Sequence, residues 1–518
     1  MSIETNTSNK RIVINLISNI VSFSSTLLIS LVLTPFLINT LGKETYSFFP
    51  LANNFVSYMT IVTNALNSMA NRFITIEIAK KNNEKANMYF SSVFYSNLIL
   101  SAILFIIMFF IVVFLDKILD IPINMVASIK ILFSFVFASM IVNVVTSVFG
   151  VATFAKNRID LRAMRELFAA ICRIVLYILF FVFLPPSIIY VGIVALIIAI
   201  INFVIQFIFT KKLLPEISFS AKSYSFMAIK ELLFSGMWNS VSNLGNILLC
   251  GVNLLLINIL YGANSAGNYS IVQTVPTFIN GTISMLTGVF VPIITYKFAE
   301  QNKIELIAVL RKSQKVIGIL TCSVIAVFIG LSIPFFRLWT PKENAVYLMV
   351  LTIIVIFPHI FVSTLWPVFN LDIVMNKVKM PSIVMLLLGI INVVIALIFK
   401  KLFNFQMEII PIVSSLLFIF WIAIYIPVYT CKKLEIKTKI VLIDTFKLII
   451  TTTVISIIIF LLQKRISINS WYSFFIIGII CGIITLLINS IVVCKRNIYL
   501  VIQRIMKNEY KFKIFRSK

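Results

Sequence analysis

Amide and hydroxyl side chains recur at helical spacing within the apolar stretch from Gly236 to Thr287. Steps of four or three residues separate the members of two sets: Asn239, Asn243, Asn246, Cys250 and Asn253, then Gln273, Thr277, Asn280, Ser284 and Thr287. At about 100° per residue, each set occupies one narrow stripe of a helix. An amide that faces hydrocarbon without a partner costs about 2–7 kcal/mol, so these stripes should face water or other helices. The spacing therefore predicts two walls of a water-filled cavity with an uncharged, hydrogen-bonding lining.

Two apolar stretches near the start of the chain show the same pattern. The first contains Asn15, Asn19, Ser22 and Thr26, and the second contains Asn53, Ser57, Thr60, Asn64 and Asn67. The second set matches the set from Gln273 to Thr287 at a constant offset of 220 residues, and Asn-x-x-Ser-Asn begins at both Asn15 and Asn239. This repetition predicts a parallel internal repeat, six membrane spans followed by six, in which the first two spans of each half face one cavity. Hydrogen bonding between helices is the alternative role for these residues.

Two arginines could bind an anionic group of a substrate. Arg173 lies well inside an apolar segment, where an arginine costs roughly 2.5–3.5 kcal/mol and usually faces the interior of a helix bundle. Its guanidinium matches the arrangement of phosphate oxygens. The alternative is a side chain about two helical turns from the inner surface that extends to that surface. Arg72 is the second candidate, although ordinary membrane topology also explains a basic residue at the inner end of a span.

Three ionisable residues could couple transport to an ion: Asp372, Glu231 and His359. The two carboxylates lie at inner ends of spans, where solvation or pairing with Lys377 and Lys230 is the alternative. The histidine could carry protons or simply bond between helices. No nucleophile–base constellation and no HExxH, GxSxG or Walker-type motif occurs, and the six cysteines lack the spacing of a disulfide framework or a metal site. The sequence therefore predicts a protein that moves a substrate and is not an enzyme.

The elements that must position these residues are membrane helices. Of the 518 residues, 60% are hydrophobic and only 12% are charged, whereas soluble domains are about 45–50% apolar and 25% charged. Stretches of about 20 apolar residues, long enough to span a bilayer, occur about fourteen times. We place them at residues 12–39, 45–70, 89–114, 127–154, 164–184, 187–210, 232–260, 266–296, 314–338, 345–370, 380–399, 408–430, 444–463 and 471–493. The predicted fold is an all-α polytopic membrane protein with two pseudosymmetric six-helix lobes and two C-terminal helices.

The net charge of +26 is distributed as membrane topology requires and does not indicate a nucleic-acid partner. Basic residues gather in every second connection and in the C-terminal tail, which places both termini in the cytoplasm by the positive-inside rule. The same residues can attract anionic membrane lipids. The predicted parts are an N-terminal lobe (1–212), a linker with an interfacial amphipathic helix (213–230), a C-terminal lobe (231–433), two extra transmembrane helices (434–494) and a basic cytoplasmic tail (495–518).

Short motifs at the ends of several spans resemble those of a known family. They are Leu41-Gly42-Lys43-Glu44-Thr45-Tyr46, Ala70-Asn71-Arg72-Phe73, Asn82-Asn83-Glu84-Lys85-Ala86 and Arg337-Leu338-Trp339. The chain resembles the Wzx-like polysaccharide flippases of the multidrug/oligosaccharidyl-lipid/polysaccharide (MOP) superfamily along its whole length. Ser47 stands where that family usually has glycine, which affects no functional residue. The individual functional charges of such flippases match no motif here, so none is transferred.

The resemblance implies a MATE-like fold of two lobes that open alternately to each side of the bacterial cytoplasmic membrane. It implies an undecaprenyl-diphosphate-linked oligosaccharide as substrate, and a polysaccharide polymerase and glycosyltransferases as partners. No cofactor is expected beyond coupling to Na⁺, H⁺ or the membrane potential. One alternative is a multidrug cation antiporter, which needs a membrane-embedded carboxylate that the first and seventh spans lack. Others are a lipid II flippase, which should have several cavity cations, and a membrane scaffold, which would need no polar stripes.

Overall fold

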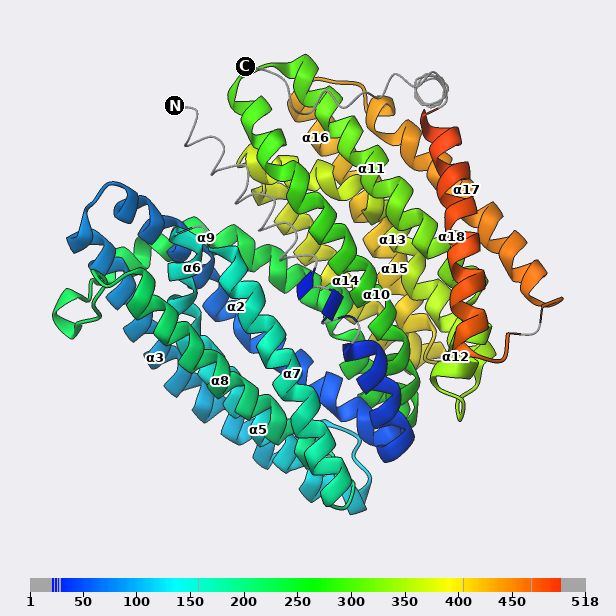
Figure 1. Ribbon diagram of the computed structural model, residues 1–518, viewed down its shortest axis with the longest axis horizontal. Helices are drawn as coiled ribbons and strands as arrows, with labels where there is room; N and C mark the ends of the chain where they lie inside the picture. The colour runs from blue at the N-terminus through cyan, green and yellow to red at the C-terminus, as the bar shows by residue number, and fades with distance from the viewer. Residues whose placement is uncertain are drawn as a thin grey trace. The chain divides into compact units, whose positions relative to one another are not determined.

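A computed structural model describes residues 21–494, except residues 23, 26, 28, 157, 404 and 467, and the described part contains helices and no strands (Figure 1). The first helix covers Ile29–Leu41. The labelled helices that follow are α2 (Lys43–Ala79), α3 (Asn83–Val113), α4 (Leu115–Ile118), α5 (Val126–Thr146), α6 (Val151–Ala155), α7 (Ile159–Phe183), α8 (Ile189–Leu213), α9 (Phe226–Asn246), α10 (Asn253–Ala299), α11 (Lys303–Gly330), α12 (Ser332–Trp339), α13 (Ala345–Val374), α14 (Lys379–Phe403), α15 (Ile409–Ile419), α16 (Ile426–Leu434), α17 (Lys439–Gln463) and α18 (Trp471–Cys494). Shorter turns are η1 (Ile123–Met125), η2 (Ser147–Gly150), η3 (Ala221–Ser223), η4 (Ile247–Gly251) and η5 (Phe420–Tyr425).

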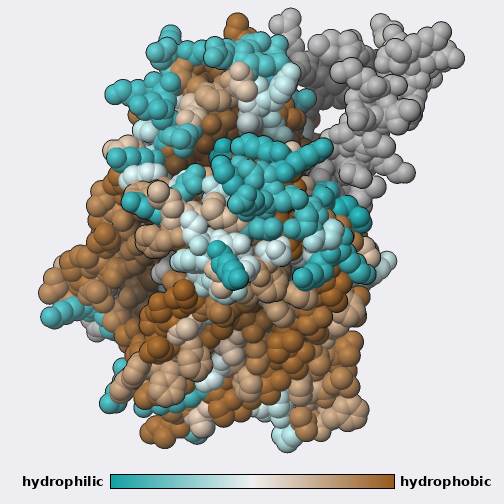
Figure 2. Space-filling view, turned by 90° about the vertical axis from the view of Figure 1, so that its left-hand side faces the viewer, coloured by the Kyte–Doolittle hydropathy of each residue, from teal (hydrophilic) through white to brown (hydrophobic). Residues whose placement is uncertain are grey.

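The all-α membrane fold is confirmed. Among the described residues, eleven helical stretches are long and apolar enough to cross a membrane, and one of them, Phe226–Ala299, contains two helical arms that meet at Gly262. Each predicted span from 45–70 onward falls on a helix, and the first span lies partly outside the described residues. Large hydrophobic side chains are exposed along α3, α7, α17 and α18. On the face shown in Figure 2, hydrophobic side chains cover broad areas, as expected of a surface that contacts lipid.

The described chain forms two compact units. The first contains the residues up to Thr274 together with Val378–Leu417, and the second contains Val275–Lys377 and the residues from Phe418 onward. Helices α10 and α15 cross from one unit to the other. The boundaries predicted from the repeat, at residues 212 and 433, stay predictions.

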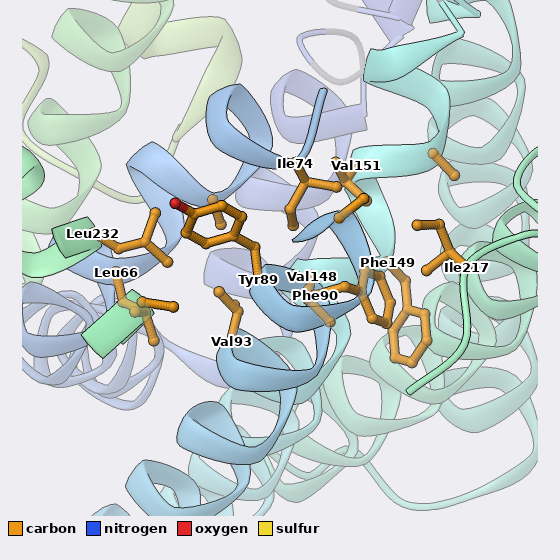
Figure 3. Packing of buried hydrophobic residues seen from close by; sticks show 14 of the residues in the cluster. Leu66, Ile74, Tyr89, Phe90, Val93, Val148, Phe149, Val151, Ile217 and Leu232 are labelled. Carbon is orange, nitrogen blue, oxygen red and sulfur yellow. The ribbon is translucent and has the colours of Figure 1, made fainter. Parts of the chain in front are cut away.

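In the first unit, one buried cluster joins α2, α3, α6 and α9 (Figure 3). Leu66 and Ile74 come from α2, Tyr89 and Phe90 come from α3, and Leu232 comes from α9. Phe149, in the turn η2, packs edge-on against Phe90 with the ring centroids 5.7 Å apart. The cluster therefore fixes the first turns of α9, the helix that carries the predicted polar stripe, against α2 and α3.

The connection from α8 to α9 differs from the predicted amphipathic helix. Residues 214–225, which we call the strap, contain only the short turn η3, and α9 begins at Phe226. The strap lies along α3 because three of its backbone N–H groups donate to α3 side chains. The acceptors are Asn87 Oδ1 (2.9 Å), Ser91 Oγ (3.1 Å) and Ser92 Oγ (2.9 Å). Serine and asparagine side chains compete well for backbone groups, so a polar α3 favours this extended path over a helix.

In the second unit, the last two helices are firmly packed against α11. Asn489 of α18 is fully buried, donates to Ser323 Oγ (2.9 Å) and accepts from Thr451 Oγ1 (2.7 Å). Gly330 lies so close to α17 that an added Cβ would be 2.6 Å from Ile459. Small residues and buried amides are typical contacts between helices in a membrane.

Candidate functional site

The candidate site is built around a π-helical turn, η4, that follows α9. In such a turn each backbone hydrogen bond joins residues i and i+5. Here the N–H of Val252 donates to the carbonyl of Ile247 at 2.8 Å. The altered bonding leaves carbonyls of the turn available to side chains. The Gly251 carbonyl accepts from Tyr58 Oη at 3.0 Å and from Asn54 Nδ2 at 3.3 Å, both on α2. Helix α2 is therefore bonded directly to the turn.

Beside these bonds lies a cavity of about 260 Å³ between α2 and the α9–η4 segment. Its lining residues are Asn54, Ser57, Tyr58, Thr60, Asn243, Asn246, Ile247 and Gly251. None of them is charged, and six carry an amide or hydroxyl group. Such a lining can donate and accept hydrogen bonds without selecting for either sign of charge, which suits the hydroxyl groups of a sugar.

The opposite face of the same segment is tightly packed against α14. Asn392 is fully buried and its Nδ2 donates to the carbonyls of Leu248 (3.1 Å) and Leu249 (3.2 Å). A Cβ added to Gly245 would lie 2.6 Å from the backbone of α14, and one added to Gly389 would lie 2.8 Å from the Gly245 carbonyl. On one side the turn is thus held by close backbone contact with α14, and on the other side it borders the cavity.

The π-turn explains where the stripe residues of α9 point. Asn243 and Asn246 precede the turn and line the pocket, whereas Asn253 follows it. One extra residue in a turn rotates the rest of the helix by about 100°. Asn253 accordingly faces away from the pocket, where it donates to Ser414 Oγ (2.8 Å) and accepts from Asn392 (3.2 Å). Asn239, at the other end of the stripe, is exposed.

The stripe on α2 is also divided between pocket and packing. Ser57 and Thr60 line the pocket. Asn53 is exposed and bonds within its own helix, to the Phe49 carbonyl at 3.1 Å. Asn64 is half-buried and lies outside the pocket lining. Asn67 exchanges hydrogen bonds with Asn97 of α3, which is the alternative, interhelical role of such residues.

Arg173 lies on the face of α7 that turns toward the first helix. On either side of it along α7, Glu166 accepts from Ser22 and Phe181 packs edge-on against Phe36, with ring centroids 5.3 Å apart. Fourteen residues separate Arg173 from the start of α7 at Ile159, about 21 Å at 1.5 Å per residue. Arg173 is half-buried and forms no ion pair within the described part of the chain. A guanidinium without an ion pair among the described residues can bind an anionic group.

The other charged candidates have various partners. Arg72 is exposed on α2. Glu231 accepts from Tyr89 Oη at 2.7 Å. Asp372 is fully buried and accepts from Thr430 Oγ1, at 2.9 Å to each carboxylate oxygen, and it forms no ion pair among the described residues. His359 is buried, and its Nδ1 lies 3.2 Å from the Val355 carbonyl in its own helix.

Several predicted residues are not part of the pocket. Asn15 and Asn19 lie outside the described residues. Gln273 is half-buried near the end of the first unit, and Asn280 is exposed in the second unit. Of the predicted binding residues, Asn243 is the one that lines the described cavity.

Asn54 and Tyr58 were missed by the sequence reasoning. They lie directly beside Asn53 and Ser57, on the neighbouring line of α2, and are four residues apart, so helical spacing alone could have paired them. The role of Gly251 had no comparable signal, because its carbonyl becomes an acceptor only through the π-turn.

Around the kink of α10 at Gly262, polar contacts join segments that are far apart in the sequence. Gly262 has a φ of 87°, which glycine tolerates, and the Asp120 carboxylate accepts from the N–H of Ala263 at 3.3 Å. Asp120 N–H donates to Asn258 Oδ1 at 3.0 Å, and Lys43 Nζ donates to Asn268 Oδ1 at 3.1 Å. These contacts join the start of α2 and the connection after α4 to α10.

Comparison with known proteins agrees with this architecture. The family model described as "Polysaccharide biosynthesis protein" matches residues 12–297. The "Uncharacterized membrane protein EpsK" of Bacillus subtilis (strain 168) is 27% identical over 419 residues, which cover 81% of this chain and 83% of that protein.

Solved structures show the same fold at low sequence identity. An inward-facing multidrug resistance MATE family transporter of the MOP superfamily has a TM-score of 0.67 at 13% identity, covering 80% of this chain and 98% of its own. The lipid II flippase MurJ, in an inward closed conformation, has a TM-score of 0.65 at 15% identity, covering 94% and 99%. These findings confirm the resemblance to Wzx-like flippases of the MOP superfamily. The chain is an integral membrane protein that shares its fold with these transporters, and it belongs to the polysaccharide biosynthesis protein family.

Proposed function

We propose that the protein carries an undecaprenyl-diphosphate-linked oligosaccharide across the bacterial cytoplasmic membrane by alternating access. The uncharged, hydrogen-bonding pocket between α2 and η4 is the observation that supports this substrate. Sugars present many hydroxyl groups, and the six amide- or hydroxyl-bearing side chains of the lining can pair with them. The pocket can hold only part of an oligosaccharide, so it serves as a contact point for one sugar residue.

Arg173 supplies the cation that the diphosphate of such a substrate requires. Its guanidinium can bind phosphate oxygens with two parallel hydrogen bonds, while a polyprenyl tail remains in the bilayer. A lipid II flippase is the second candidate, because the fold of MurJ covers nearly the whole chain. A cation antiporter is less compatible with the pocket, because no carboxylate lines it.

Coupling to Na⁺, H⁺ or the membrane potential is part of the proposal, and Asp372 is the residue to which we assign it. A buried carboxylate with hydroxyl hydrogen bonds and no counter-ion within the described residues can accept a proton or a cation. Both termini are assigned to the cytoplasm by the positive-inside rule, where glycosyltransferases would supply the substrate. A polymerase would act on it on the outer side.

The test is complementation of a strain that lacks the gene. Asn243→Ala and Arg173→Ala should each strongly reduce surface polysaccharide, with accumulation of lipid-linked oligosaccharide on the inner leaflet. The matched controls are Ser134→Ala, an exposed hydroxyl that bonds within α5, and Arg162→Ala, an exposed arginine on α7. Both controls should export normally at equal protein levels. Normal export by Asn243→Ala and Arg173→Ala would exclude the pocket and the arginine from the mechanism.

A further inference from the structure

A cluster with more basic than acidic side chains lies where α11 and α17 meet in the second unit, far from the pocket in sequence. Asp444 of α17 is 4% exposed. Three cations surround its carboxylate: Arg311 at 3.1 Å, Lys315 at 3.7 Å and Lys447 at 3.7 Å. One carboxylate against three cations leaves an excess of two positive charges in a partly buried place.

No other acidic group within the described residues compensates this excess. Glu435, in the connection before α17, is paired with Lys303 at 3.7 Å and is 86% exposed. Gln314, on the neighbouring turn of α11, uses its amide to donate to the Val441 carbonyl at 3.2 Å. The Nε atom of Arg311 is buried and has no hydrogen-bond partner in the described part of the chain. A buried donor without an acceptor is unfavourable by about 1–3 kcal/mol, so the cluster is suited to receive an anion.

The surface beside the cluster indicates which anion. On both sides of Lys447, large hydrophobic side chains are exposed at helical spacing along α17. They are Ile443, Phe446, Ile450, Val454 and Ile457. Arg311 and Asp444 lie eight and five residues after the starts of their helices, about 12 Å and 8 Å along the axes at 1.5 Å per residue. Both residues therefore lie within the first three turns of helices whose starts the positive-inside rule assigns to the inner surface, and the exposed stripe can lie against an acyl chain.

We propose that Arg311, Lys315 and Lys447, arranged around Asp444, bind the phosphate of an anionic phospholipid of the inner leaflet. The three cations neutralise the phosphate, and the apolar stripe of α17 contacts an acyl chain. Helices α17 and α18 pack against α11 (Figure 1). A lipid bound between α11 and α17 strengthens this packing. The site does not depend on the transported substrate.

The experiment is native mass spectrometry of the full chain in detergent, titrated with phosphatidylglycerol, phosphatidylcholine or inorganic phosphate. Lys315→Gln combined with Lys447→Gln keeps the Arg311–Asp444 pair and removes two cations. We expect this variant to bind phosphatidylglycerol about tenfold more weakly, because charge-assisted contacts to phosphate are lost. Phosphatidylcholine binding should not change. The matched control is Lys212→Gln with Lys222→Gln, which removes the same charge from exposed lysines of the first unit.

Lys447→Gln alone keeps two cations beside Asp444 and is less disruptive to folding. This variant should also bind phosphatidylglycerol more weakly, whereas Lys447→Arg, which keeps the charge, should bind it as the unaltered protein does. An equal loss of phosphatidylglycerol binding in the control variant would overturn the proposal, because the effect would then be one of net charge. Displacement of phosphatidylglycerol by equimolar inorganic phosphate would also overturn it, because the site would then recognise free phosphate and not a lipid.

Discussion

The two faces of the α9–η4 segment are built on different principles. Toward α14, backbones approach closely at Gly245 and Gly389, and Asn392 occupies two carbonyls of the turn. Toward α2, two side chains, Asn54 and Tyr58, share a single carbonyl, and a cavity of about 260 Å³ lies beside them. The first face resembles a permanent helix contact. On the second face, few hydrogen bonds join the η4 turn itself to α2, so the turn can move away from α2 while the start of α9 stays packed in the buried cluster. A carrier needs both, because one contact must persist while the other opens to substrate.

Breaking the α14 face should have the largest effect. Gly245→Leu places a side chain where even a Cβ would be 2.6 Å from backbone atoms of α14. Overpacking typically costs 1–3 kcal/mol and more where backbone must move, so we expect roughly complete loss of monodisperse protein. Size-exclusion chromatography of a fluorescent fusion measures it. Gly251→Ala is the control, because its Cβ would have no neighbour closer than 3.6 Å. Equal loss of monodisperse protein in both variants would show that close packing against α14 does not distinguish the two faces.

A smaller loss is expected from Asn392→Leu. This change removes three buried hydrogen bonds, to Leu248, Leu249 and Asn253, and leaves acceptors unsatisfied at about 1–3 kcal/mol. The midpoint of thermal unfolding in detergent should fall by several degrees. Asn53→Leu, at an exposed amide of α2, serves as the comparison and should leave the midpoint unchanged. An unchanged midpoint for Asn392→Leu would mean that the glycines alone hold this face.

Weakening the α2 face should alter conformation more than stability. Tyr58→Phe deletes the 3.0 Å bond to Gly251, a contribution of about 0.5–1.5 kcal/mol. We expect at most about a tenfold shift toward the separated state, with little change in the unfolding midpoint. Cross-linking between cysteines introduced at Ser57 and Asn243, which line the same cavity, reports the separation. A fall in the midpoint as large as that of Asn392→Leu would show that both faces are structural.

The smallest effect is expected from Asn54→Ala. Its bond to the Gly251 carbonyl is long, at 3.3 Å, and Tyr58 still occupies that acceptor. Cross-linking should therefore change less than twofold, whereas export of the proposed lipid-linked oligosaccharide should decline because the pocket loses an amide. Export equal to that of the unaltered protein would remove Asn54 from the substrate contacts.

The helices and their polar stripes could be predicted because both depend on local periodicity. Asn243, Ser57 and Thr60 reach the cavity as the 100° spacing requires. The prediction loses validity at η4, because a π-turn changes the angle per residue and Asn253 turns to Asn392 and Ser414. No residue in Ile247–Gly251 marks such a turn in advance.

Long-range competition for backbone groups was equally invisible in the sequence. The strap has the composition of an amphipathic helix, but Asn87, Ser91 and Ser92, well over a hundred residues earlier, hold it extended. Asn67 likewise has the same spacing as its neighbours in the stripe, and its pairing with Asn97 depends on how α3 packs against α2. Periodicity predicts which face a residue occupies, and it does not predict which neighbour that face will meet.

The strap also has a mechanical consequence. Because it is fastened to α3 at three points, the covalent connection between α8 and α9 has little free length with which to follow a moving helix. Displacement of the start of α9 would either break these bonds or pull α3 along with it. A movement of α9 would then be coupled to a movement of α3, a helix that does not line the cavity.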